Sequence, residues 1–433
     1  MVIRSGFLLL LLLITGQVFA QDLLTVEQAI AVSLKNNYDI QIAKNREEIS
    51  SINNNIGNAG MLPRANITVT DNASLNNLNQ KFSSGLLVDQ KNVSGNNLNP
   101  ALNISWTLFD GLKMFATKSK LKRLAEIGEL NYKDTLQTIV AQTINAYYDV
   151  VSANQQLKAL NEAIKISEER VKVAETRFRV GSSSKVDWLQ AKVDLNEQKS
   201  GLLNQNKVIE QKKAELNRIL ARAAETEFIT ADSIPINYDT NLNSSNELES
   251  KNFQLLAASK NIEIARFSKK EVFAQFLPNL NVNGAYAFTR SQSSAGFSLY
   301  NQTYGLSGGF TLAVPLFNGL NTIHQYKIAG IQILNSQFAL EKAKIQTKLN
   351  FYKVLRDFET TKEILKLEED NIVLADENVK IALERFRLAQ STAIELREAQ
   401  NSYEDARTRL VNARFNTKVA ETELMRLQGA LVK

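Results

Sequence analysis

Few side chains in this sequence could do chemistry. His324 is the only histidine and cysteine is absent, so two-histidine zinc motifs, thiolate metal sites, disulfides and a cysteine nucleophile are excluded. Any catalytic triad would depend on His324, for which a solvated or capping role is the more common one. The sequence contains no phosphate-binding glycine loop. We therefore predict no enzyme, no catalytic residues, no cofactor and no metal site, and any process that consumes energy must draw it from a partner.

Three carboxylates are notable for their spacing. Asp187 and Glu395 occupy corresponding positions of an internal repeat, and Glu398 follows Glu395 by three residues. Residues three apart share one face of a helix. From the residues alone, all three are expected to be solvated charges on helix flanks.

Long helices must position these carboxylates, and the apolar spacing shows where the helices lie. A three-four spacing of apolar or small residues is typical of a coiled-coil seam, although an ordinary helical bundle core would show it too. The same seam returns 208 residues later with one charged exception, so the chain contains an internal twofold repeat. The first seam is Leu157, Leu160, Ile164, Ser167, Val171, Ala174 and Phe178, and the second is Leu365, Glu368, Ile372, Ala375, Val379, Ala382 and Phe386.

A second helix follows each seam. Its apolar positions recur every seven residues, as a left-handed supercoil requires. We predict turns between the paired helices near Val180 to Lys185 and near Leu388 to Ala393. The heptad positions are Trp188, Leu195, Leu202, Ile209 and Leu216, and then Leu396, Tyr403, Leu410, Thr417 and Leu424.

The N-terminal segment is predicted to be a secretory signal peptide. Residues 1–20 carry one arginine, an unbroken apolar run from Phe7 to Ile14 and small residues before the expected cleavage site after Ala20. Removal of Arg4 with this segment lowers the net charge from +6 to +5. No later segment has 18 consecutive apolar residues, so no membrane helix is expected. Export without disulfides suits the periplasm or outer membrane of a Gram-negative bacterium.

The basic balance does not indicate nucleic-acid binding, because Lys and Arg alternate with Glu and Asp along the predicted helices. One basic cluster opens a long helix and is either a plain solvated helix end or a segment near phospholipid head groups. The cluster is Lys118, Lys120, Lys122 and Arg123. Proline is absent from 112–180 and from 316–433, which permits very long helices. A helix from about Gly111 to Phe178 would be roughly 100 Å long.

Alternating segments between the helices predict β-strands. Leu102 to Leu108, Leu280 to Thr289 and Tyr304 to Val314 alternate apolar with small or uncharged polar residues, and Ala65 to Asp71 is a weaker fourth run. These lengths approach those of transmembrane strands, but a soluble β-domain would alternate as well. The polar segments 72–99 and 290–303 are expected to be long solvent-exposed loops.

Four strands cannot close a membrane barrel, and an open sheet edge is not tolerated in lipid. A barrel would have to be shared between chains. Two copies would give eight strands with a filled interior, whereas three would give twelve strands and a lumen.

The sequence resembles the TolC-like outer-membrane efflux protein family over nearly the whole mature chain. The resemblance rests on the repeat, the paired helices, the turn Arg177 to Gly181 and the junctions Trp106 to Gly111 and Val314 to Gly319, both with Leu-Phe-Asp/Asn-Gly. It implies an α+β membrane protein: a long antiparallel α-helical coiled-coil tunnel, and four transmembrane β-strands per chain in a shared trimeric β-barrel.

This resemblance also implies the function and the partners. A homotrimer in outer-membrane lipid, extending into the periplasm, would dock onto a periplasmic adaptor protein and an inner-membrane transporter. It would be the passive channel of a tripartite efflux or type I secretion system, exporting small molecules or proteins. The alternative is a structural coiled-coil or adhesin-like surface protein, which would have no use for a strand pair in each half.

The resemblance divides the chain into eight segments. They are the signal peptide 1–20, N-terminal helices 21–61, a first barrel hairpin 62–110, a first long helical hairpin 111–225, a linker 226–246, helices 247–276, a second barrel hairpin 277–318 and a second long helical hairpin 319–433.

Two sets of site residues follow from the resemblance. The adaptor-docking turns would be Val180, Gly181 and Ser182 together with Leu388, Ala389 and Gln390. The tunnel entrance would carry Asp187, Glu395 and Glu398, where crowded like charges would attract cations and raise carboxylate pKa values. The chain departs from the family at two places. Ala389 replaces the usual glycine, and Ser391 stands where some members have a gate-locking arginine.

Overall fold

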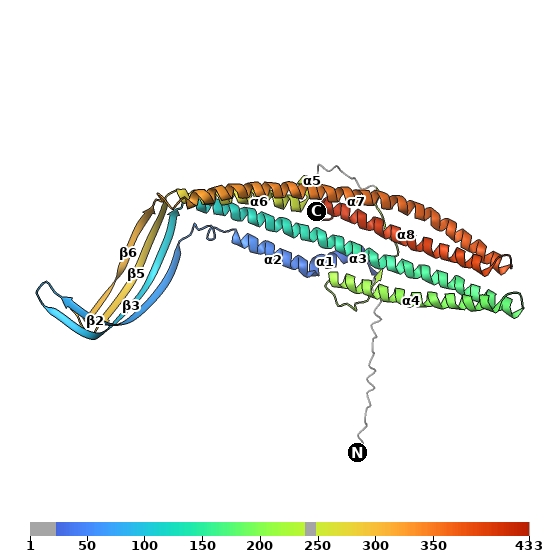
Figure 1. Cartoon of the computed structure of the whole chain (residues 1–433), viewed down its shortest axis with the longest axis horizontal. Coiled ribbons are helices and arrows are strands. Elements are labelled where there is room, and N and C mark those ends of the chain that lie inside the picture. The colour runs from blue at the N-terminus through green and yellow to red at the C-terminus, as the bar shows by residue number, and fades with distance from the viewer. Residues whose placement is uncertain (1–22, 239–247, 433) are drawn as a thin grey trace, which may run out of the picture. The chain divides into compact units, whose positions relative to one another are not determined.

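The computed structural model of the protein describes residues 23–238 and 248–432 (Figure 1). The predicted signal peptide, residues 1–20, lies outside the described residues, as do residues 239–246 of the predicted linker. Within the two described ranges, no helix is both long and apolar enough to cross a membrane. The chain folds as two compact units. The first contains Met1–Ile40, Leu136–Leu242 and Phe351–Lys433, and the second contains Gln41–Thr135 and Asn243–Asn350.

Four long helices repeat in length and position. Helices α3 (Lys113–Arg179) and α7 (Asn321–Arg387) have 67 residues each, and α4 (Lys185–Ile219) and α8 (Ala393–Leu427) have 35 each. Each helix of the second half begins and ends 208 residues after its counterpart, as Lys113 and Asn321 illustrate. The predicted helical hairpins and the internal repeat are confirmed.

Shorter elements complete the first unit around the N-terminal strand. Strand β1 (Leu23–Leu24) pairs in parallel with β4 (Ile229–Thr230), and a capping box of Thr25 and Gln28 starts α1 (Val26–Asn36). The Tyr147 hydroxyl of α3 donates to the Leu24 carbonyl at 2.8 Å and accepts from the Ala231 amide at 3.1 Å. Buried apolar residues surround this contact, so the short strands are fixed to the helical core.

The second unit contains the four-stranded antiparallel sheet, in the order β2-β3-β5-β6 (Figure 1). Its strands are β2 (Arg64–Lys81), β3 (Leu87–Phe109), β5 (Asn279–Ser293) and β6 (Tyr300–Ala313). Three further helical segments lie before β5, namely α5 (Leu248–Lys251), α6 (Phe253–Phe273) and the 3-10 turn Ala274–Phe276. Helix α2 (Tyr38–Asn53) begins in the first unit and continues into the second.

The prediction of a long polar loop at 72–99 is wrong. Strands β2 and β3 pair with each other from Arg64 and Ser105 to Lys81 and Leu87, with one irregularity between Asn76 and Leu78. Backbone hydrogen bonds between the two strands do not need apolar side chains, so an asparagine-rich segment can still form a hairpin. The predicted loop at 290–303 is shorter too, because β5 reaches Ser293 and β6 starts at Tyr300.

The sheet has two unlike faces. Along one face lie small or uncharged side chains such as Ser105, Asn283 and Gly309, which are paired across the strands. The opposite face carries apolar side chains such as Trp106, Val282 and Phe310, which are likewise paired and are exposed by 42%, 36% and 77%. An apolar face exposed to this extent must be covered by a partner or by lipid.

Both long helices are entered through the same turn. Gly111 and Leu112 have φ angles of 71° and 70°, and the corresponding Gly319 and Leu320 have φ angles of 67° and 65°. The Asp110 carboxylate, just before the first turn, accepts from the Met114 amide at 2.9 Å and so caps α3. Two successive left-handed residues turn the chain sharply from strand to helix.

Candidate functional site

The turn between α3 and α4 is a Schellman cap. The Gly181 amide donates to the Phe178 carbonyl at 3.0 Å, and the Ser182 amide donates to the Arg177 carbonyl at 2.8 Å. Gly181 has a φ angle of 77°, and a β-carbon added there would meet no atom within 4 Å. Glycine therefore serves the backbone conformation at this turn, and the space around it is open.

The turn between α7 and α8 has the same hydrogen bonds. The Ala389 amide donates to the Phe386 carbonyl at 3.2 Å, and the Gln390 amide donates to the Arg385 carbonyl at 2.8 Å. Ala389 adopts a φ angle of 62°, a conformation that costs an alanine roughly 1–2 kcal/mol. The second turn thus keeps the shape of the first despite the missing glycine. Neighbouring Ser391 has a buried hydroxyl oxygen without a partner among the described residues.

Apolar side chains at the two turns face solvent in matching positions. Val180 and Leu388 are exposed by 72% and 66%, and Val186 and Ile394, one per hairpin as well, by 69% and 68%. Each pair is related by the 208-residue repeat. Repeated exposure of this kind is typical of a surface that binds another protein.

Aromatic side chains pack just behind the two turns, both within the first hairpin and between the two hairpins. Phe178 stacks on Trp188, with ring centroids 5.6 Å apart. The Arg177 guanidinium of the first hairpin lies 4.5 Å from the ring centroid of Phe386 in the second. Phe386 itself is 2% exposed and belongs to a cluster with Leu396. The two turns therefore rest on a common packed layer.

The three predicted entrance carboxylates do not share one environment. Asp187 is half-buried and accepts from the Ser183 hydroxyl at 2.8 Å. Glu395 lies in the first turn of α8, where the Thr392 hydroxyl accepts from its amide at 3.2 Å, and its carboxylate is 3.8 Å from Arg385. Glu398 is exposed on the same helix. Glu395 thus follows the Thr392 cap and has a cation beside it, whereas Glu398 is exposed to solvent.

The sequence analysis did not predict a buried polar network that joins α3, α4 and α8 behind the turns. Arg170 of α3 is 3% exposed, donates to Gln400 of α8 at 2.8 Å and pairs with Asp194 of α4 at 2.5 Å. The Arg170 Nε, the Gln400 Nε2 and the Ser167 hydroxyl are buried without partners among the described residues. Leaving buried polar atoms unpaired costs stability. The heptad pattern gave no sign of this network, because Arg170 falls between two seam positions.

Glu404 borders this network and titrates abnormally. Burial raises the pKa of the Glu404 carboxyl to about 6, and the neighbouring Asp405 charge acts in the same direction. Arg170 opposes the shift more weakly. The Gln198 amide donates to the Glu404 carboxyl at 2.5 Å. Glu404 therefore changes its charge near neutral pH.

We expect the stability of the first unit to depend on pH through Glu404. The folded-state pKa is about 6 against an ordinary value of 4.5, so the folded chain binds the proton more tightly. The stabilisation is present below pH 4.5 and is lost as pH rises through 6, by up to about 2 kcal/mol. In thermal unfolding at pH 5 and pH 7.5, Glu404→Gln should reduce the difference in midpoint shown by the natural chain. An equal difference in both proteins would contradict this assignment.

The remaining candidates have ordinary structural roles. His324 is exposed in the first turn of α7. Three members of the basic cluster have partners: Lys118 donates to the Asn54 carbonyl at 2.8 Å, Lys120 pairs with Glu271 and Arg123 pairs with Glu126 and Glu263. Within residues 23–238 and 248–432, no group of three or more metal-ligating side chains could hold an ion.

The comparison with protein families identifies the chain. The family described as outer membrane efflux protein matches residues 29–222 and 244–430, that is, both halves of the internal repeat. The chain belongs to this family. No curated protein matches the sequence significantly.

Solved structures show the same fold. The Campylobacter jejuni CmeC outer membrane channel is 16% identical, with a TM-score of 0.78 over 94% of this chain and 85% of that one. The outer membrane protein VceC from Vibrio cholerae is 16% identical, with a TM-score of 0.74 over 93% and 96%. The open-state MtrE outer membrane channel from Neisseria gonorrhoeae is 15% identical, with a TM-score of 0.71 over 94% and 89%.

Membership of this family fixes the function in general terms. The chain is an outer-membrane efflux channel of a Gram-negative bacterium, with two long helical hairpins and a four-stranded sheet. Channels of this family work as trimers with an adaptor protein and an inner-membrane pump. Its relatives are channels rather than enzymes.

Proposed function

We propose that three copies of this chain close one twelve-stranded barrel and form a passive conduit through the outer membrane. The observation that carries the proposal is the four-stranded sheet, whose edge strands β2 and β6 have no neighbour on their outer sides within the described residues. Unpaired strand edges are not stable in lipid, and pairing β6 of one copy with β2 of the next removes them. Twelve strands leave room for a lumen.

The two faces of the sheet support the same arrangement. The apolar face, with Trp106, Val282 and Phe310, suits contact with lipid. The face with Ser105, Asn283 and Gly309 suits a water-filled passage. Small uncharged residues on that face leave the passage open to polar cargo.

The mature protein, extracted from outer membranes in mild detergent, is expected to have about three times the mass of one chain. Native mass spectrometry measures this directly, and membrane fractionation locates the protein. A stable monomer, or recovery from the soluble periplasm, would contradict the proposal. A disulfide between cysteines introduced on β2 and β6 should in addition form only between copies.

The two helical turns are the proposed docking surface for a periplasmic adaptor, which connects the channel to an inner-membrane transporter. Support comes from the exposed pairs Val180 with Leu388 and Val186 with Ile394. The common aromatic layer behind the turns presents both at fixed spacing. In a trimer this arrangement would repeat three times.

The tunnel entrance is proposed to prefer cations because of Glu395 and Glu398. Three copies would gather six of these carboxylates at a narrow opening. Removal of the Glu398 charge should have the larger effect, because Glu395 already lies near Arg385. Single-channel reversal potentials in a salt gradient should therefore show cation preference in the natural protein. The preference should fall more in Glu398→Gln than in Glu395→Gln, and most in the double variant.

A matched control for this measurement is Glu384→Gln. Glu384 pairs with Arg387 at 2.6 Å on α7, before the second turn. A reversal potential that stays the same in the double variant would show that both carboxylates are ordinary solvated charges on the helix flank.

A further inference from the structure

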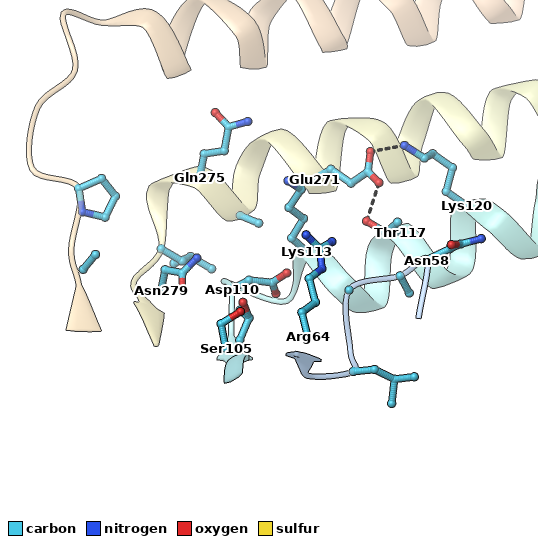
Figure 2. Close-up of a pocket in the computed structure, with 18 of the residues that line it drawn as sticks. Asn58, Arg64, Ser105, Asp110, Lys113, Thr117, Lys120, Glu271, Gln275 and Asn279 are labelled. Carbon is cyan, nitrogen blue, oxygen red and sulfur yellow. Dashed lines mark hydrogen bonds and ion pairs between the residues drawn. The ribbon is translucent and has the colours of Figure 1, made fainter. Parts of the chain in front are cut away.

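A polar cavity lies in the second unit, where the sheet meets the start of α3 and the end of α6 (Figure 2). Its volume is about 970 Å³, near the upper end of the range for small-molecule pockets. Strand residues such as Ser105 and Asn279 form one wall, and helical residues such as Thr117 and Gln275 form the other. None of the docking-turn residues or entrance carboxylates lines this cavity.

Two of the five charges that line the cavity compensate each other. Lys120 pairs with Glu271 at 2.5 Å, and the Thr117 hydroxyl donates to the same carboxylate at 2.7 Å, as the dashed lines in Figure 2 show. The Asp110 carboxylate accepts from the Met114 amide at the start of α3. Glu271 is thus paired with a cation, whereas Asp110 keeps its negative charge. Three cations and two carboxylates line the cavity, so its lining carries one net positive charge.

Two cations remain. Arg64 opens β2 and Lys113 opens α3, and Figure 2 shows both side chains at the cavity. Neither makes a side-chain hydrogen bond or an ion pair with any of the described residues. Arg64 offers a planar fork of donors and Lys113 a compact point charge, which together suit an oxyanion. The positive end of the α3 dipole adds to the attraction.

An unsatisfied side-chain amide lies on the strand wall of the cavity. The Asn279 Oδ1 atom is buried and has no hydrogen-bond partner among the described residues. It could accept from a hydroxyl group or from a protonated phosphate oxygen. A ligand carrying both an anionic group and a hydroxyl would therefore satisfy groups that the chain leaves open.

The position of Arg64 shows which face of the sheet the cavity belongs to. Arg64 pairs in register with Ser105, which pairs in turn with Asn283 on the small and uncharged face. In the proposed barrel this face borders the lumen, so the inference rests on the proposed function. Three copies would place six such cations around one passage.

We propose that Arg64 and Lys113 form a binding site for the phosphate or carboxylate groups of anionic solutes that pass this junction. The channel would then attract cations at its periplasmic entrance and hold anions at the start of the barrel. A solute with separated positive and negative groups would meet a complementary charge at each place.

The test uses inorganic tripolyphosphate and the purified trimer in a non-ionic detergent. Isothermal titration calorimetry should show binding to the natural protein, and binding to the Arg64→Gln, Lys113→Gln double variant should be about tenfold weaker or more. Lys122→Gln is the matched control, because Lys122 is exposed on the same helix but does not line the cavity. Equal affinity in the natural protein and the double variant, or no binding to the natural protein, would overturn the proposal.

Two further arms separate the causes of a failure. Phosphate groups of lipids could also bind to Arg64 and Lys113. The titration is therefore repeated with the trimer in nanodiscs of zwitterionic or of anionic phospholipid. Affinity should be equal in both, and a weaker affinity in anionic lipid would assign the site to lipid and overturn the proposal for solutes. A monomeric protein by native mass would refute the proposed function itself, whereas an intact trimer without binding would refute only this site.

Discussion

Gly111→Ala is expected to destabilise the protein more than the same change at Gly319, its counterpart in the second half. A β-carbon at position 111 would lie 2.5 Å from the Ala274 carbonyl oxygen and 2.8 Å from the Leu277 β-carbon. Both neighbours are backbone or directly attached to it, so neither can rotate away. The φ angle of 71° adds strain of its own. Overpacking and a left-handed alanine together should cost about 2–6 kcal/mol per chain.

The internal repeat supplies the control. Gly319 occupies the corresponding turn with a φ angle of 67°, but an added β-carbon would meet no atom within 4 Å. Gly319→Ala should therefore cost only the conformational strain, about 1–2 kcal/mol. Thermal unfolding of both variants, followed by circular dichroism, measures the difference. Equal losses would show that the contact with Ala274 does not contribute.

These two junctions illustrate what the sequence can and cannot predict. The motif Leu-Phe-Asp/Asn-Gly occurs in both halves, and it correctly marks both strand-to-helix junctions. It does not show that only Gly111 packs against a neighbouring backbone, because that contact comes from the 3-10 turn at the end of α6. A local pattern predicts the conformation, whereas packing depends on segments distant in sequence.

The helical half was predictable because its pattern is long and periodic. Leu365, Phe386 and Leu396 come from the predicted seams and are at most 2% exposed. Even the charged exception, Glu368, has a structural explanation, because Arg409 pairs with it at 3.0 Å. Seven-residue repetition over several turns leaves few alternatives to paired helices.

The sheet and the polar network were harder to predict. Asn76 and Leu78 lie in a segment whose composition is typical of a loop, and only the backbone pairing with β3 makes it a strand. The Arg170 network joins three helices through side chains whose spacing carries no period. Polar contacts of this kind depend on the relative rotation of the helices, which heptads fix only approximately.

Gly181→Trp is expected to abolish docking of the adaptor while leaving the trimer intact. The turn lies at the exposed end of the first hairpin, where an added β-carbon would meet no atom of the chain within 4 Å. The indole would therefore project into the space that a docked protein must occupy. The φ angle of 77° costs a tryptophan roughly 1–2 kcal/mol. That strain acts on the turn itself and is small beside the stability of a folded domain, about 5–15 kcal/mol, so the trimer should stay intact.

Two control variants distinguish the effect of side-chain size on docking from the effect of backbone strain in the turns. Gly181→Asn adds a small side chain that tolerates the left-handed conformation, and it should keep most of the docking. Ala389→Gly removes strain from the second turn, where the φ angle is 62°, and should leave docking unchanged. A photoreactive residue in place of Ser182 reports docking as cross-links to the adaptor in cells, and native mass confirms the trimer. Cross-linking at the natural level in Gly181→Trp would show that the turns do not meet the adaptor.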